Sequence, residues 1–309
     1  MNKPKIALLL GGISAEREVS LKTGEEIGKA LDKEKYEVTF YDPRDDLLSL
    51  CQYIDQGDVD LVIPALHGPF GEDGRIQGML DMWKIPYLFS GCLASAVAMN
   101  KEWSKKIVNE EGVPIIKGKK LQRKDNIGKN IKDISFPLVI KPVELGSSVG
   151  INIVKKEEEL KEAIEQAFHY DDNILVEEYV KGRELTVTVM GRKEPQALPV
   201  IEIIPKKSEW FDFQAKYEPG ATDEICPADI PENIKERIQE QAVKAFQVLG
   251  CRDVARVDFI WEESEDIIYF LEINTIPGMT STSLVPQAAQ AAGKSFSQFL
   301  DELIEGALK

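Results

Sequence analysis

The sequence has few of the features that mark membrane proteins or nucleic-acid-binding proteins. Its 309 residues carry 38 basic against 53 acidic side chains, and the net charge of −15 opposes binding to nucleic acids and anionic membranes. Apolar runs are short, as in residues 6–10 and 61–66, whereas a helix that crosses a bilayer needs about 20 apolar residues. We therefore expect a soluble protein with no nucleic-acid or membrane partner.

Cysteine is also sparse. Cys51, Cys92, Cys226 and Cys251 lie far apart, form no CxxC pair and follow no secretory leader. This usage is typical of free thiols in a reducing compartment, so we expect a cytoplasmic protein without disulfides.

Two common nucleotide-binding motifs are absent. The Gly11-Gly12 turn does not complete the G-x-G-x-x-G fingerprint of dinucleotide-binding proteins, and no G-x-x-x-x-G-K-[ST] loop occurs. A nucleotide site in this chain must therefore use another phosphate cradle.

The first hundred residues have the pattern of an α/β domain with a doubly wound parallel sheet. Residues 5–10 predict a strand that ends in a glycine turn before a helix, and residues 37–41 and 61–66 predict two further strands. The last of these is apolar enough to be buried on both faces. Ligands bind beyond the carboxyl ends of such strands, where Glu16 and His67 fall.

A turn-forming segment follows the strand over residues 61–66. Three glycines between His67 and Gly74 allow a ligand to approach the backbone closely, although an ordinary surface loop would have the same composition. His67 considered alone is more often a structural, hydrogen-bonded histidine than a ligand-binding one.

A second phosphate-binding candidate lies in the middle of the chain. Residues 136–142 predict a strand that ends near Lys141, and a loop over residues 146–150, rich in glycine and serine, leads to the next strand. Backbone N–H groups and hydroxyls in such a loop can bind phosphate oxygens, and the lysine adds a positive charge. We expect domains over residues 1–98, 99–182 and 183–309.

Residues 205–227 form a polar stretch with several aromatic residues and little periodicity. Long stretches of this kind are usually functional lids or disordered segments, and we expect a lid loop here.

Near the carboxyl end, two predicted strands carry polar side chains on one face. Arg256 and Asp258 share a face of the first strand, and Glu272 and Asn274 share a face of the second. A short polar link predicts a hairpin that sets these rows side by side. Hard oxygen ligands of this kind suit Mg²⁺ held against phosphates, although a hairpin with one solvated face would show the same alternation.

Taken together, these motifs resemble the D-alanine:D-alanine ligases, which belong to the ATP-grasp superfamily. The resemblance covers essentially the whole chain in order, and it implies a three-domain ATP-grasp fold, α/β with an α+β character in its ATP-grasp part. The motifs that carry it are residues 11–20, His67-Gly68, Gly71-Glu72-Asp73-Gly74, residues 146–150, Ala215-Lys216-Tyr217, Arg256-Val257-Asp258, Glu272-Ile273-Asn274 and Pro277-Gly278-Met279-Thr280-Ser281.

The resemblance also implies a nucleotide site between the second and third domains. ATP would be a substrate, bound with two Mg²⁺ or Mn²⁺ ions that neutralise charge during phosphoryl transfer. The implied phosphate contacts are Lys101, Lys141, Ser148 and Lys216, the implied adenosine contacts are Glu177 and Glu184, and the implied metal ligands are Asp258, Glu272 and Asn274.

In the implied reaction, one D-alanine carboxylate attacks the γ-phosphate, and the amine of a second D-alanine then attacks the resulting acyl phosphate. Glu16 would pair with the first ammonium group, linked by hydrogen bonds to Ser147 and Tyr217, and His67 would lie near the first substrate. Arg256 and the Gly278 N–H would stabilise the tetrahedral oxyanion. Ser283 and the Leu284 N–H would hold the second carboxylate.

Three alternatives stay open at this point. Ester-forming relatives that make D-alanyl-D-lactate replace the lid tyrosine, so Tyr217 argues against that activity. Other ATP-grasp carboxylate–amine ligases, and a nucleotide-binding module without catalysis, are the remaining two. Glu144 and Glu178 depart from the common family pattern and bear on nucleotide affinity. The family also implies a homodimer.

Overall fold

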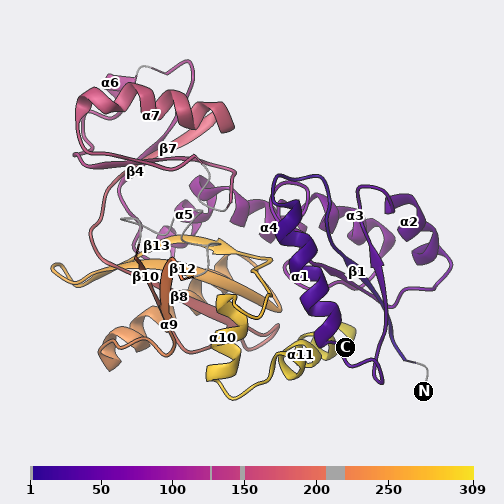
Figure 1. Cartoon of the computed structure of the whole chain (residues 1–309). Helices are drawn as coiled ribbons and strands as arrows, with labels where there is room; N and C mark the ends of the chain where they lie inside the picture. The colour runs from indigo at the N-terminus through magenta and orange to yellow at the C-terminus, as the bar shows by residue number, and fades with distance from the viewer. Residues whose placement is uncertain (1–2, 126, 147–149, 207–219) are drawn as a thin grey trace.

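Three β-sheets with helices packed against them make up the fold, and Figure 1 shows how they follow one another along the chain. The structure is a computed structural model that describes residues 3–125, 127–146, 150–206 and 220–309, with all of their side chains except that of Lys129. Within these ranges, no helix is long and apolar enough to cross a membrane.

The first sheet is the predicted parallel sheet. β1 (Lys5–Leu9) lies between β2 (Glu37–Tyr41) and β3 (Leu61–Pro64) and pairs in parallel with both. All four residues of β3 are buried, as its apolar sequence predicts, although the strand ends two residues earlier than the apolar run.

Helices cover both faces of this sheet, which makes it doubly wound. Ile6 and Leu8 of β1 share a core with Ile27 of α1 (Arg17–Ala30). Ala7 and Leu9 point to the opposite face, where they pack with residues of two other helices. Three helices of this region were not predicted from the sequence: α2 (Leu47–Asp55), α3 (Arg75–Trp83) and α4 (Cys92–Met99).

The second sheet is antiparallel and belongs to the middle of the chain. Its strand order is β4-β7-β5-β6, and one helix packs across it to close a separate apolar core. The elements are β4 (Gly118–Gln122), α6 (Ile127–Asn130), β5 (Leu138–Pro142), β6 (Asn152–Val154), α7 (Glu157–Tyr170) and β7 (Asn173–Glu178).

Helix α5 (Lys101–Glu110) connects the first sheet region to the second. The side chain of Asn100 caps it by accepting a 3.1 Å hydrogen bond from the Trp103 N–H. Its buried residues include two lysines, Lys101 and Lys105, on the same helix face.

The third sheet contains the predicted hairpin. Its strands run in the order β11-β10-β8-β12-β13, with β9 beside β8 and every pairing antiparallel. The elements are β8 (Arg183–Met190), β9 (Gln196–Ala197), β10 (Ile201–Pro205), β11 (Thr222–Ile225), α9 (Glu232–Val248), β12 (Val254–Glu262), β13 (Ile267–Asn274), α10 (Leu284–Ala291) and α11 (Phe296–Leu308).

Strand β11 corrects one prediction. The prediction of an irregular stretch over residues 205–227 is wrong near its carboxyl end, because residues 222–225 form a strand that pairs with β10 at the edge of the sheet. Asp223 and Glu224 have low strand propensity, and charged residues are common on edge strands because they discourage further pairing. Residues 207–219 lie outside the described ranges.

The amino- and carboxy-terminal parts of the chain share one core. Ile27 of α1 belongs to the same buried cluster as Phe299 and Leu303 of α11, and the two helices are in contact. Figure 1 shows the carboxy-terminal helix lying against the first helix.

Candidate functional site

The hairpin of β12 and β13 brings the predicted polar rows together. Arg256 lies opposite Asn274, and Asp258 lies opposite Glu272. On the other face, Val257 and Phe259 are fully buried in the core behind the sheet. The alternation read from the sequence therefore holds, and it gives the sheet one polar platform.

Three polar neighbours hold Asp258 on this platform. Arg256 binds it through two hydrogen bonds, from Nε to Oδ1 at 2.9 Å and from Nη2 to Oδ2 at 2.8 Å. The Asn274 amide donates to Oδ2 at 3.0 Å, and the Thr186 hydroxyl of β8 donates to Oδ1 at 2.6 Å. Thr186 carries no motif, and only the pairing of β8 with β12 reveals its contact.

Lys101 links the platform to the middle of the chain. Its Nζ lies 3.2 Å from Glu272 Oε2 and donates a 2.6 Å hydrogen bond to the Leu145 carbonyl, which precedes the glycine-rich loop. The side chain is only 8% exposed. A single ammonium group thus joins α5, β13 and the candidate phosphate loop.

The donor set of the platform fits a hard divalent cation. Asp258 and Glu272 supply carboxylate oxygens from directly opposed ladder positions, and Asn274 adds an amide oxygen on the same face. Such oxygen ligands are those that Mg²⁺ and Mn²⁺ prefer.

A second charged cluster lies in the central sheet. Glu177 of β7 is 2% exposed, and its Oε2 lies 2.7 Å from Lys141 Nζ of β5. Its Oε1 accepts a hydrogen bond from Lys105 Nζ of α5. Burial lowers the pKa of Lys105 to about 7, against the opposing effect of the Glu177 charge. Burial alone would raise the pKa of Glu177, but the two lysines lower it below its ordinary value.

Sequence reasoning found Lys141 and Glu177 but missed Lys105. The available signal was its position one helical turn after Lys101, on the face that also carries Ser104 and Val108. Glu184, the other predicted adenosine contact, lies half-buried near the start of β8, between Ile203 and Ile260 on the neighbouring strands.

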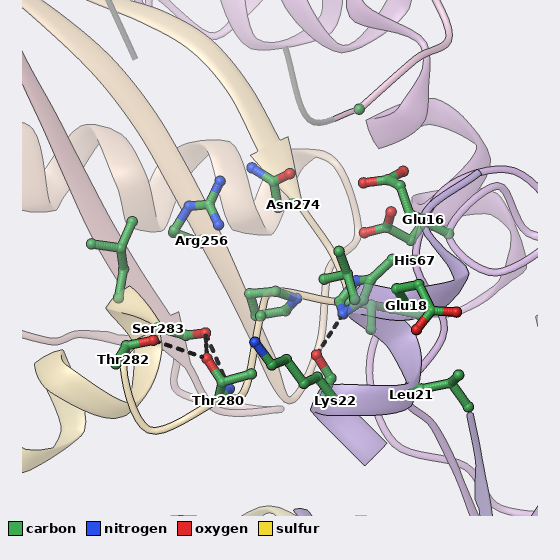
Figure 2. A pocket seen from close by; sticks show the side chains of 18 of the residues that line it. Glu16, Glu18, Leu21, Lys22, His67, Arg256, Asn274, Thr280, Thr282 and Ser283 are labelled. Atoms are coloured by element: carbon green, nitrogen blue, oxygen red, sulfur yellow. Dashed lines mark hydrogen bonds between the residues drawn. The ribbon is translucent and has the colours of Figure 1, made fainter. Parts of the chain in front are cut away.

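A cavity of about 610 Å³ opens between the first and third sheet regions. Figure 2 shows Glu16 and His67 on the side formed by the amino-terminal part, opposite Arg256 and Asn274. The remaining predicted substrate residues also line it: Gly278, Ser283 and Leu284. Five further charged residues of its wall were not predicted as site residues: Glu18, Lys22, Glu25, Glu72 and Glu224.

His67 is neutral at the edge of this cavity. Its ring Nε2 forms a 2.9 Å hydrogen bond with the Thr23 hydroxyl, and the residue is 7% exposed. Burial, with a smaller effect of Arg256, lowers its pKa to about 4. The structure therefore combines both interpretations of His67, since the ring is hydrogen-bonded and also lines the cavity.

Two carboxylates lie around Gly68 at the cavity wall. Gly68 has φ +73°, and a Cβ at this position would lie 2.5 Å from Glu16 Oε2, so only glycine fits. Its N–H donates a 2.6 Å hydrogen bond to Glu72 Oε2. Burial and then the charge of Glu16 raise the pKa of Glu72 to about 8. Glu72 is therefore mostly protonated at neutral pH, and the carboxylate of Glu16 gives this wall an acidic character that favours an ammonium group.

The opposite end of the cavity presents a helix amino terminus. Ser283 precedes α10, and its hydroxyl accepts a 3.1 Å hydrogen bond from the Thr280 N–H. Leu284 is the first residue of the helix, where backbone N–H groups lack intrahelical acceptors and favour an anion. The cavity thus has an acidic wall and an anion-favouring end.

Four predicted site residues lie outside the described ranges: Ser147, Ser148, Lys216 and Tyr217.

Family models match most of the chain. A model described as D-ala D-ala ligase C-terminus matches residues 103–305, and one described as D-ala D-ala ligase N-terminus matches residues 49–92.

Full-length relatives and solved structures agree with these matches. The chain is 48% identical to a D-alanine–D-alanine ligase of Syntrophobacter fumaroxidans, over 99% of this chain and 98% of that protein. The crystal structure of the Bacillus anthracis D-alanine–D-alanine ligase complexed with ATP has a TM-score of 0.84 at 34% identity, and covers 99% of this chain and 97% of that one. The VanG D-Ala:D-Ser ligase of Enterococcus faecalis has the same TM-score at 33% identity, covering 98% and 99%.

Proposed function

The chain belongs to the D-alanine:D-alanine ligase family, and we propose that it joins two D-alanine molecules in a reaction that converts ATP to ADP and phosphate. The single observation that carries the proposal is the cavity that sets Glu16 opposite Arg256 and the start of α10. Two amino acids fit this arrangement, because the ammonium group of the first would face Glu16 and the carboxylate of the second would face the start of α10, which are opposite electrostatic environments.

In the first step, the carboxylate of one D-alanine attacks the γ-phosphorus of ATP, the bond to the β-phosphate oxygen breaks, and D-alanyl phosphate and ADP form. Lys101 and Lys141 would hold the phosphates, since both are buried cations beside the chain that leads into the glycine-rich loop. Asp258, Glu272 and Asn274 would hold two Mg²⁺ or Mn²⁺ ions, which supply charge neutralisation when bound. Glu177 and Glu184 would contact the adenosine.

In the second step, the amine of the second D-alanine attacks the acyl carbon, and phosphate leaves from the tetrahedral intermediate. Arg256 points into the cavity and would stabilise the oxyanion together with the Gly278 N–H. Ser283 and the Leu284 N–H would bind the second carboxylate, and Glu16 the first ammonium group. We assign Ser147, Ser148, Lys216 and Tyr217 the roles that the family motifs imply.

The acceptor is the point on which relatives differ, because a D-Ala:D-Ser ligase has the same fold. The decisive experiment measures phosphate release with Mg-ATP and D-alanine alone, and the products formed when D-serine or D-lactate is added in equal concentration. We expect release with D-alanine alone and predominance of D-alanyl-D-alanine. No release with D-alanine, or equal use of L-alanine, would refute the assignment.

Further features of the proposal concern organisation and location. We propose functional domains over residues 1–98, 99–182 and 183–309, and a cytoplasmic enzyme that supplies a peptidoglycan precursor.

We also propose a homodimer formed through α3 and α4, which are in contact with each other. Met82 and Leu93 are 80% and 77% exposed on these helices, and paired copies would bury them. Light scattering should give twice the chain mass, and Met82→Glu with Leu93→Glu should give the monomer.

A further inference from the structure

Helix α5 buries two lysines where a helix usually buries apolar side chains. Lys101, Ser104, Lys105 and Val108 follow the spacing of one helix face, and all four are buried. Lys105 has a side-chain exposure of 4%, although lysine is almost never buried this deeply without a partner. A leucine or methionine would fill such a position without the cost of desolvating a charge, so the lysine calls for a functional explanation.

The partner of Lys105 is a carboxylate that is shared with a second lysine. Glu177 binds Lys105 through Oε1 and Lys141 through Oε2, so each carboxylate oxygen has its own cation. The cluster contains two lysines and one carboxylate, so protonation of both lysines leaves an excess positive charge in a buried place. A nucleotide phosphate would balance that charge by drawing Lys141 away from Glu177.

The two lysines are attached to different parts of the fold. Lys141 lies on β5, next to β7 in the same sheet, and the chain runs from it toward the glycine-rich loop. Lys105 lies on α5, whose Lys101 is tied to Glu272 of the third sheet. Lys105 therefore approaches Glu177 from the side of the third sheet, and it can keep Oε1 occupied after Lys141 has left Oε2.

We propose that Lys105 is a positioning residue that fixes Glu177 for recognition of a 6-aminopurine nucleotide. With Oε1 held by Lys105, Oε2 is presented as an acceptor for the exocyclic amine of adenine. A 6-oxopurine offers a carbonyl oxygen there, which a carboxylate repels. This inference rests on the proposed contact of Glu177 with the adenosine, and it deepens the proposed function by assigning base selectivity to a residue that would not touch the base.

The test compares binding of Mg-ATP and Mg-GTP by calorimetry in the absence of D-alanine. Lys105→Met removes the charge and keeps most of the side-chain volume, and we expect it to weaken ATP binding about 10- to 100-fold while GTP binding changes little, since hydrogen bonds to charged groups are worth about 1.5–3 kcal/mol. The ATP:GTP affinity ratio should fall by the same factor. Lys105→Arg should restore part of that ratio, because it keeps a cation that can donate to Oε1.

Lys106→Met is the matched control, because Lys106 lies on the same helix but is 56% exposed and pairs with Glu102 at 2.7 Å. It should leave both affinities unchanged. Equal weakening of ATP and GTP binding by Lys105→Met would overturn the proposal and show a merely structural role.

A double-mutant cycle keeps the proposal testable if Lys105→Met folds poorly. In a Glu177→Gln background, Lys105→Arg should no longer alter the ATP:GTP ratio, and an undiminished effect would overturn the inference. The readout is also separate from the proposed ligase activity. A wild-type protein that binds ATP selectively but releases no phosphate with D-alanine would refute the activity and leave the role of Lys105 standing.

Discussion

The two charged clusters of the molecule differ in their internal balance. The central cluster of Lys105, Lys141 and Glu177 holds two lysines against one carboxylate. On the platform, Arg256 pairs with Asp258 and Lys101 pairs with Glu272, so each of these two basic side chains contacts a different carboxylate. The central cluster is also more deeply buried, since Glu177 is 2% exposed whereas Glu272 is 21% exposed.

This difference indicates two modes of ligand binding. With both lysines protonated, the central cluster carries an excess positive charge. It can bind a polyanion with the loss of one internal contact, that between Lys141 and Glu177. On the proposed assignment, Arg256 and Lys101 would have to leave Asp258 and Glu272 before these carboxylates could act as metal ligands. We therefore expect substitutions in the central cluster to act on stability and nucleotide affinity, and substitutions on the platform to act on turnover.

The largest effect should follow removal of the shared carboxylate. Glu177→Leu leaves two lysines buried without their partner, and we expect the free energy of unfolding to fall by about 3–5 kcal/mol. Urea denaturation measures this change. Glu178→Leu, at the half-exposed neighbouring position, is the control and should cost far less. A loss below about 1 kcal/mol for Glu177→Leu would show that the cluster does not stabilise the fold.

Substitution of Arg256 should affect catalysis instead of stability. Arg256→Met removes the proposed oxyanion partner, and we expect kcat to fall about 10²- to 10³-fold with little change in ATP affinity. Arg237→Met is a suitable control, since Arg237 pairs with Asp266 on the exposed turn of the same hairpin. If Arg256→Met weakened ATP binding as strongly as it lowered kcat, the platform would not act on turnover alone, and the proposed difference between the two clusters would be contradicted.

Lys141→Met should separate affinity from stability within the central cluster. The remaining pair of Lys105 and Glu177 is balanced, so we expect the free energy of unfolding to change by less than about 1 kcal/mol. ATP binding should weaken about 10-fold or more, because a charged phosphate contact is lost. Calorimetry and urea denaturation together check both values. A destabilisation as large as that of Glu177→Leu would contradict the view that the cluster holds one more lysine than its carboxylate needs.

The smallest effect concerns pH and His67, which lies near the platform. The pKa of His67 in the folded state is about 4, below its ordinary value of 6.5, so the unfolded state binds a proton first as the pH falls. The contribution of neutral His67 is complete above pH 6.5 and is lost as the pH falls toward 4. Between pH 7 and 5 we expect a loss of about 1–2 kcal/mol in the free energy of unfolding.

His67→Gln should remove this component of the pH dependence. The difference between the unfolding curves of the wild type and the variant should therefore narrow toward low pH. Curves that stay parallel from pH 7 to pH 5 would contradict a buried, neutral His67.

The sequence predicts the platform well because strand alternation is a local rule. Arg256, Asp258, Glu272 and Asn274 share a face in any regular hairpin, whatever surrounds it. Family motifs then identify the cavity residues, including Glu16 and Ser283, which are 267 positions apart in the numbering.

Other features depend on long-range packing that no local pattern reveals. Lys105 becomes notable only because its side chain reaches Glu177 of β7, and Thr186 only because β8 pairs with β12. Strand β11 escapes prediction because its acidic residues resemble a loop. In each case the deciding contact joins segments that are distant in sequence, and intrinsic propensity is overridden by tertiary context.

The core shared by α1 and α11 has a consequence for synthesis on the ribosome. Ile27 and Leu31 complete their burial against a cluster that includes Phe299 and Leu303, which are translated much later. Part of the apolar surface of the amino-terminal sheet therefore stays uncovered until α11 has emerged. Premature termination before α11 would leave that surface exposed and aggregation-prone, so the amino-terminal core depends on a helix that is translated more than 250 residues after α1.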